Sequence, residues 1–359
     1  MSLRWHGPGM SWKQTMIGAG FAACRATGLA RAAAPLTQGL GAILMLHHVR
    51  PARASAYAPN RELEITPEFL DDVLQLLKRR GWLLASLDEA IERVRVGETD
   101  RPIAALTFDD GYRDTVEWAL PILTRERAPM TMFATTGFID RSARLWWPEI
   151  EEAVRRLSTI EIALGGEHLR LSTSTESEKN RVAEILLAKL RASPQDEVDR
   201  VASELSQRAH VDRRALVEEL CLNGGEIAEL SRDPLVAIGA HTRTHPMLAK
   251  IDGEKARAEI IEPKAQLEAL TGKPVRHLAY PVGDRGSAGP REFQLAAAAG
   301  YASAVTTRPG MLFPEHAEHL TALPRLSING RYQSIAQVDA LLTGLPFALW
   351  NRGRRVSAA

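Results

Sequence analysis

The sequence predicts an α/β fold, a distorted barrel of seven or eight β/α units with a helical insertion. From Gly41 onward, short apolar runs alternate with longer amphipathic segments, which is typical of parallel strands that are each followed by a helix. This rhythm is interrupted between Trp146 and Leu230, where the chain is long, charged and helix-like. We therefore expect one barrel over residues 41–332 that carries an insertion at about residues 146–230.

The strand and helix signals follow in order along the chain. After the first apolar run, Thr66, Pro67 and Glu68 supply a helix N-cap, a proline in the first turn and an early acid, and Gly81 ends the helical pattern. Within the insertion, two short β-prone runs at 160–164 and 168–171 predict a hairpin. The barrel strands are expected at residues 42–49, 82–85, 104–108, 130–135, 235–240, 277–280, 302–306 and 325–328.

The composition limits the classes of partner and of metal site. With 359 residues, of which 45% are hydrophobic, the chain can bury a large core. Forty-five basic and 44 acidic residues give a formal net charge of +1, which provides no overall field to attract nucleic acid. Cys24 and Cys221 are the only cysteines, so neither a disulfide framework nor a four-cysteine zinc site can form. We expect a neutral or mixed-charge partner.

Both ends of the chain are predicted to lie outside the barrel. Residues 1–40 are expected to form a helical extension, and residues 333–359 a C-terminal helix with a basic tail. The apolar stretch 15–24 weakly resembles a signal sequence, but Arg25 and Arg31 follow it closely and favour a helix packed on the barrel or lying on a membrane. The end of the chain favours a frayed tail over an interfacial anchor. We therefore expect a cytoplasmic or membrane-peripheral protein, while peripheral membrane contact through the termini and secretion by an atypical signal stay open.

Polar side chains that suit metal chemistry follow two of the apolar runs. Asp109 and Asp110 come directly after run 104–108, and His241 and His245 come directly after run 235–240. Each motif alone also fits an ordinary role, such as an Asp-Asp-Gly surface turn. Together, however, strand ends that meet at one barrel mouth predict a divalent metal held by two imidazoles and one carboxylate, with an open position for water. The residues alone do not decide which aspartate binds the metal.

Two further strand ends could reach the same mouth. The run that begins at Arg276 ends in Tyr280, Pro281, Val282 and Gly283, a turn whose backbone N–H could stabilise an oxyanion, although an ordinary Pro-Gly turn fits as well. The pair His47-His48 lies near the end of the first apolar run, where a histidine is more often a hydrogen-bonded core residue. The turn and the histidine pair become candidates for catalysis only if the barrel brings them close to the metal.

These stretches together resemble the motifs of polysaccharide deacetylases of the NodB homology type, carbohydrate esterase family 4. Residues 106–111 match the Thr-Phe-Asp-Asp-Gly motif, and residues 241–245 match the His-Ser/Thr-x-x-His motif. Residues 278–283 are similar to the Phe-Ala-Tyr-Pro-Tyr-Gly variant of the subgroup that acts on exopolysaccharides, and 45–47 resemble an early Tyr-His motif of that subgroup. The resemblance covers roughly residues 41–330.

The resemblance implies a role for each candidate site residue. Asp109 would be the general base. The common late histidine of the family is not evident, because residues 326–329 read Leu-Ser-Ile-Asn, and His47 would serve as the catalytic acid instead. The remaining roles are the metal ligands Asp110, His241 and His245, a brace for the histidine loop at Thr242, the oxyanion donor at the Tyr280 amide, an arginine beside the base at Arg276 or Arg325, and a substrate contact at Pro281. The family's aspartate-tryptophan motif is not evident, but Trp146 and Trp147 of the insertion could supply a stacking platform for the sugar.

The activity implied is that of a metal-dependent hydrolase, with zinc as the expected ion. Its partner would be an N-acetylated oligo- or polysaccharide, from whose amino sugars it would remove acetyl groups. Two alternatives stay open: deformylation or O-deacetylation of a sugar at the same site, and glycan binding at a membrane surface by a catalytically impaired relative. An intact set of ligands beside a free carboxylate argues against the last of these.

Overall fold

A closed barrel of parallel strands forms the centre of the protein. The computed structural model describes residues 29–358, so the signal-like stretch at 15–24 lies outside the described residues. Around the barrel the strand order is β1-β12-β11-β10-β9-β6-β5. Strand β5 closes the ring by pairing with β1, with Gly41 of β1 opposite Ile103 of β5 at one end and Leu46 opposite Phe108 at the other. The barrel strands are β1 (Gly41–Leu46), β5 (Ile103–Phe108), β6 (Met130–Ala134), β9 (Val236–Ala240), β10 (His277–Ala279), β11 (Ser303–Pro309) and β12 (Leu323–Ser327).

The seven-stranded barrel confirms the predicted fold class and corrects two strand predictions. The run at 82–85 forms β4 (Leu83–Ala85), which pairs with the first half of β5 but is not part of the closed ring. The run at 42–49 was expected to be one strand, but it is interrupted at His47. Beyond this break, β2 (His48–Val49) pairs with β3 (Glu64–Ile65) in a separate small sheet, because the chain turns at the barrel mouth.

Alternating side chains of the strands build two cores. In β1, Leu44 and Leu46 belong to the apolar layer between the strands and the surrounding helices, whereas Ile43 belongs to the barrel interior with Phe133 and Val305. The helix expected after the N-cap at Thr66 is present, and the hydroxyl of Thr66 accepts a hydrogen bond from the amide of Phe69 at 3.2 Å. The outer layer comprises α3 (Pro67–Arg79), η2 (Thr115–Ala119), α5 (Leu120–Glu126), α11 (Gly224–Leu230), α12 (Gly253–Thr271) and α13 (Pro290–Ala298). The buried side chains of α4 (Leu87–Val96) pack instead with the barrel interior.

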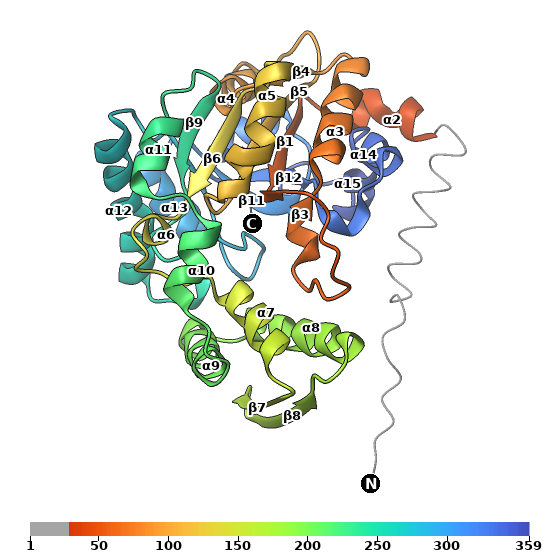
Figure 1. Ribbon diagram of the computed structural model, residues 1–359. Coiled ribbons are helices and arrows are strands. Elements are labelled where there is room, and N and C mark those ends of the chain that lie inside the picture. The colour runs from red at the N-terminus through yellow and green to blue at the C-terminus, as the bar shows by residue number, and fades with distance from the viewer. Residues whose placement is uncertain (1–28, 359) are drawn as a thin grey trace.

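The insertion forms a lobe with its own apolar core at the carboxyl end of the barrel strands. Figure 1 shows it on the side to which the arrow of β6 points. It contains α7 (Trp146–Arg156), α8 (Glu176–Ala192), α9 (Gln195–Arg208) and α10 (Arg213–Leu220), together with the predicted hairpin, β7 (Thr159–Leu164) and β8 (Glu167–Ser172). Helix α11 instead packs into the barrel layer through Ile227 and Leu230. The lobe therefore lies over the mouth where the site is expected.

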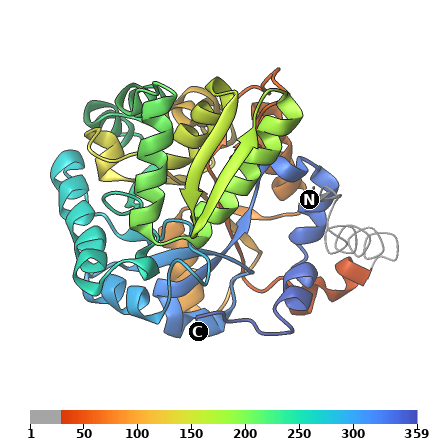
Figure 2. The same cartoon turned by 90° about the horizontal axis from the view of Figure 1, so that it is seen from below.

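Helices near the two described ends of the chain pack together on the flank of the barrel. Helix α2 (Leu29–Thr37) contacts α15 (Leu345–Trp350), and α14 (Ile335–Leu341) packs against α3 (Figures 1 and 2). Within residues 29–358, no helix combines the length and the apolar character that crossing a bilayer requires. The remaining short helices are η1 (Arg61–Leu63), α6 (Thr136–Ile139), η3 (Leu248–Lys250), η4 (Pro314–Ala322) and η5 (Gly330–Tyr332).

A substitution at Gly41, where β1 begins beside β5, tests how tightly the barrel closes. Its φ is +134°, and a Cβ at this position would lie 2.0 Å from the carbonyl oxygen of Ile103. We expect Gly41→Ala to lower the free energy of unfolding by about 2–4 kcal/mol, because backbone strain and a backbone clash act together. The control is Gly253→Ala, where no atom lies within 4 Å of the added methyl group. Equal thermal unfolding of the two variants would contradict this account.

Candidate metal centre and catalytic cavity

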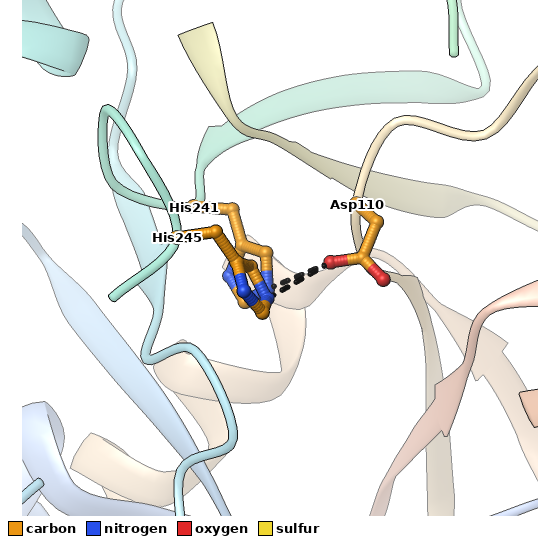
Figure 3. Close-up of side chains that lie close together, drawn as sticks. All are labelled: Asp110, His241 and His245. Carbon is orange, nitrogen blue, oxygen red and sulfur yellow. Dashed lines mark ion pairs between the residues drawn. The ribbon is translucent and has the colours of Figure 1, made fainter. Parts of the chain in front are cut away.

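The ends of β5 and β9 bring Asp110, His241 and His245 together. The Nε2 atoms of both histidines lie 3.2 Å from Oδ1 of Asp110, and all three residues are buried. Figure 3 shows the two imidazoles side by side, pointing at the carboxylate. The ligand atoms offered by the three side chains lie within 4.8 Å of one another. The predicted set of ligands is therefore assembled in space.

The geometry of this group fits a divalent ion. Oδ1 of Asp110 is buried and has no hydrogen-bond partner among residues 29–358, although two imidazole nitrogens lie close to it. A tetrahedral zinc ion with bonds of about 2.0–2.1 Å would hold its ligand atoms roughly 3.3–3.4 Å apart, close to the observed spacing. A buried carboxylate oxygen without a proton donor is costly unless a cation compensates its charge. The residues therefore suit zinc or a similar ion.

Backbone strain is concentrated at the site. Eight non-glycine residues in the described part of the chain have positive φ, and four of them surround the cavity. Asp110, Thr242, His245 and Val282 have φ values of +71°, +62°, +61° and +62°. Thr242 and Val282 are β-branched, for which this conformation is a genuine outlier. Such strain persists only where the surrounding structure holds it, and it is typical of functional sites.

Hydrogen bonds hold the histidine loop in this strained shape. Nδ1 of His241 lies 2.7 Å from the carbonyl oxygen of Ala279, so Nδ1 donates and Nε2 keeps its lone pair for a metal. The hydroxyl of Thr242 accepts the amide of His245 at 3.1 Å, which is the bracing contact predicted for it. Glu259 of α12 accepts both the Arg243 amide and the Thr244 amide. The loop is thus fixed from within and from the helix behind it.

Asp109 is distinguished from its neighbour by a buried ion pair with Arg325. Both carboxylate oxygens of Asp109 accept hydrogen bonds of 2.7 Å from the guanidinium, which is itself fully buried. Burial raises the pKa of Asp109, but the charge and hydrogen bonds of Arg325 outweigh this effect, and the pKa falls below its ordinary value. Asp109 is thus held ionised and free of the metal group.

Arg276 does not take part in this ion pair, so the alternative that placed it beside Asp109 is wrong. It precedes β10, at the amino end of the barrel, and its guanidinium bonds with Asp88 at the start of α4 at 2.8 Å. Arg325 lies in the middle of β12 and is aimed into the barrel, where the hydroxyl of Thr107 and the carbonyl of Thr306 also accept its hydrogen bonds.

His47 faces Asp109 from the break after β1. Its Nε2 lies 4.0 Å from Oδ2 of Asp109, and its side chain is 18% exposed at the cavity. Burial lowers the pKa of His47 below its ordinary value, although the charges of both aspartates partly oppose this effect. His48 points elsewhere, since its Nδ1 lies 2.6 Å from the carboxylate of Asp114. The predicted order, with His47 at the site and His48 behind it, agrees with this geometry.

The prediction that the Tyr280 amide stabilises an oxyanion is wrong. That amide donates to the carbonyl of Val305 at 3.1 Å, which extends the barrel pairing one residue past β10. The Tyr280 ring packs on Phe293 in the helical layer. Two residues later, Val282 lines the cavity, and its N–H has no acceptor in residues 29–358. Its place in the Pro-Val-Gly turn was the available signal in the sequence.

The catalytic groups open into a cavity of about 450 Å³. Trp146 and Trp147 line it as expected, but both are only 5% exposed, and the ring of Trp147 packs 4.7 Å from that of His245. The two indoles therefore form a wall of the site and not an open stacking platform. Pro281 is buried and does not line the cavity, so its predicted contact with substrate is wrong. The next residue, Val282, lines the cavity instead.

The rim of the cavity contains groups that the motif analysis missed. Asn329 stands in the segment where a late histidine was sought, and its amide donates to Ser327 at 3.0 Å. Glu62 pairs with Arg331 at 2.7 Å and with Arg191 of the lobe at 3.4 Å. These ion pairs connect the lobe to the barrel across the mouth. No local pattern in the sequence predicts such a pairing, because its members are far apart along the chain.

The family of the chain follows from comparison with known proteins. The model of polysaccharide deacetylases matches residues 96–185 and 208–304, more than half of the chain. The protein belongs to the polysaccharide deacetylase family. It is accordingly a hydrolase that acts on carbon–nitrogen bonds. The unmatched gap, residues 186–207, falls within the insertion lobe of this deacetylase. A comparison with curated proteins finds no match.

Solved structures share the barrel. The deacetylase PplD of Streptococcus pyogenes, solved in complex with acetate, is 20% identical with a TM-score of 0.52, covering 84% of this chain and 97% of its own. IcaB of Ammonifex degensii is 17% identical with a TM-score of 0.54, covering 85% and 98%. A de-N-acetylase of Aggregatibacter actinomycetemcomitans is 14% identical with a TM-score of 0.52, covering 83% and 98%. At these identities the likeness establishes the fold.

The pH dependence of the deacetylase tests the role of the buried ion pair. Arg325→Gln leaves the Asp109 carboxylate buried without its cation, so its pKa should rise. Because a base acts only when ionised, the acidic limb of the kcat/KM profile should move up by about 1–3 pH units. Acetate release from an N-acetylated oligosaccharide, measured across pH, checks this shift.

Arg276→Gln is the matched control for this measurement. It removes a half-exposed guanidinium that is paired with Asp88 and not with Asp109. Its profile should coincide with that of the unmodified protein. An unmoved acidic limb in Arg325→Gln would show that Arg325 does not set the ionisation of the base.

Proposed function

We propose that the protein is a metal-dependent deacetylase that removes N-acetyl groups from amino sugars of an oligo- or polysaccharide, with zinc as its ion. The observation that carries this proposal is the buried, unpartnered Oδ1 of Asp110 between two imidazoles, beside a second carboxylate held ionised by Arg325. A site that only bound glycan would have no need for two neighbouring carboxylates in different states. The match to the polysaccharide deacetylase family supports the substrate class.

Asp110, His241 and His245 would hold the ion. When bound, a divalent ion supplies Lewis acidity, which lowers the pKa of water and polarises the acetyl carbonyl. Asp109 is the group placed to take a proton from the attacking water, because its carboxylate is ionised and lies in the same cavity. Arg325 keeps Asp109 in position through two hydrogen bonds and prevents it from acting as another ligand.

His47 would complete the reaction by protonating the departing nitrogen. Water adds to the acetyl carbon, the carbon–nitrogen bond then breaks, and the nitrogen must gain a proton to leave as a free amine beside acetate. The burial that lowers the pKa of His47 makes its protonated form a stronger acid, which favours this transfer. Its position 4.0 Å from Asp109 would allow the proton taken from water to return through the same pair.

The backbone amide of Val282 is the proposed donor to the developing oxyanion. It lines the cavity, and its N–H has no other acceptor in the described part of the chain. A backbone N–H that is held by the surrounding fold needs no reorganisation when negative charge develops on the carbonyl oxygen. The positive φ of Val282 keeps this peptide in an orientation that a relaxed strand would not give.

Asp109→Asn tests the reaction class and the division of roles together. Because Asp110, His241 and His245 are unchanged, the variant should retain about one equivalent of metal. Loss of the base should lower kcat for acetate release by about 10²–10⁴-fold. Metal analysis and acetate release, before and after chelation and restoration with zinc, provide the measurement. Full activity in Asp109→Asn, or in the chelated protein, would contradict the proposal.

His47→Gln tests the catalytic acid. An amine leaving group needs a proton, whereas an aryl oxide of low pKa leaves without one. We therefore expect kcat to fall by about 10²–10⁴-fold on an N-acetylated sugar and to change little on an aryl acetate ester. Metal content should be unchanged. Equal losses on the amide and the ester would show that His47 has a structural role only.

A further inference from the structure

Helices α2 and α15 present large apolar side chains to solvent on the flank of the barrel. Leu36 is 74% exposed, Leu349 is 65% exposed and Trp350 is 63% exposed. Arginines follow directly in the sequence after α15. We call the set of Leu36, Leu349, Trp350, Arg352 and Arg354 the terminal surface.

Two hollows connect four of these five residues; the fifth, Leu349, precedes Trp350 in α15. A hollow of about 200 Å³ is lined by Leu36 of α2 and by Arg354, among others. A second hollow of about 260 Å³ is lined by Trp350, Arg352 and again Arg354. Because both hollows share Arg354, the apolar and basic groups lie next to each other. Neither Arg352 nor Arg354 has a carboxylate within ion-pair distance among residues 29–358.

Charge is strongly segregated between the ends of the chain and the rest. Residues 1–40 and 340–359 contain seven basic residues and no acidic residue. The remaining residues therefore contain 38 basic and 44 acidic side chains, an excess of six negative charges in a chain of net charge +1. The described parts of these two ends lie together, since α2 contacts α15. Of the four basic residues in the described parts of these ends, Arg31 pairs with Asp339 and Arg355 pairs with Glu315, so Arg352 and Arg354 carry the positive charge beside the exposed apolar side chains.

We propose that the terminal surface docks on an anionic lipid bilayer. Tryptophan and leucine side chains next to arginines suit the membrane interface, where apolar groups enter the acyl boundary and cations meet lipid phosphates. A soluble polyanion such as nucleic acid would use the arginines but would leave three large apolar side chains in water.

Figures 1 and 2 show α2, α14 and α15 beside the barrel, whereas the insertion lobe lies over the end of its strands. The segment after α15 approaches the mouth, because the second hollow is also lined by Arg285, whose neighbour Asp284 lines the cavity, but none of the five residues of the terminal surface lines the cavity itself. Membrane binding and deacetylation can be tested separately for this reason.

Co-sedimentation of the full chain with vesicles tests the proposal. The vesicles contain phosphatidylcholine alone or a mixture of phosphatidylcholine and phosphatidylserine, at low and at high ionic strength. We expect binding to the mixed vesicles that weakens with salt. Two double variants, Leu349→Ser with Trp350→Ser and Arg352→Gln with Arg354→Gln, should each lower the partition coefficient by about tenfold or more.

Matched controls use residues of the same kind elsewhere on the surface. Trp118→Ser removes a tryptophan of η2 that is 42% exposed, and Arg213→Gln with Arg214→Gln removes two exposed arginines of α10. Both controls should bind vesicles like the unmodified protein, and all variants should keep their thermal unfolding and their acetate release from a soluble substrate. Absence of binding to anionic vesicles, or unchanged binding in both double variants, would overturn the proposal. Sensitivity to the arginines alone would assign the surface to a soluble polyanion.

Discussion

The buried ion pair between Arg325 and Asp109 is the interaction on which the chemistry of the site depends. Two adjacent aspartates have the same intrinsic acidity, and only their surroundings can give them different functions. Arg325 binds both oxygens of Asp109, whereas Oδ1 of Asp110 faces two imidazoles and no proton donor. The fold thus gives these two neighbouring carboxylates different surroundings, which suit the proposed roles of base and metal ligand. The arrangement also couples function to folding, since a buried charge that loses its partner is strongly destabilising.

The barrel supplies the rigidity that this separation requires. Asp110, Thr242, His245 and Val282 all have backbone conformations that an isolated loop would leave. They remain strained because parallel pairing fixes the strand before each loop, and because side chains such as Glu259 fix the loop from behind. The strain turns two consecutive carboxylates, which would otherwise point to opposite sides, toward one cavity. The stable pairing of the strands therefore holds the loops at their ends in the strained geometry of the site.

Local patterns in the sequence predicted most of the fold. They did not predict properties that depend on where a residue points in the folded protein. Apolar runs placed every barrel strand, and motif spacing placed the three metal-site residues at one mouth. Arg276 and Tyr280 were misjudged for a different reason: distance along the chain does not reveal which end of a strand a residue occupies, or that an amide is already used in strand pairing. The break at His47 was missed because the apolar run continues through it.

A net charge near zero likewise concealed an arrangement that only the fold reveals. The value of +1 argues against a general attraction for polyanions, and it still does so for the acidic body of the molecule. Arg352 and Arg354, however, follow α15 without a carboxylate partner among residues 29–358, beside exposed Leu349 and Trp350. Within a screening length of about 8–10 Å, a nearby surface responds to that flank and not to the total. The local distribution of charge, and not its sum, determines which partner can approach each face.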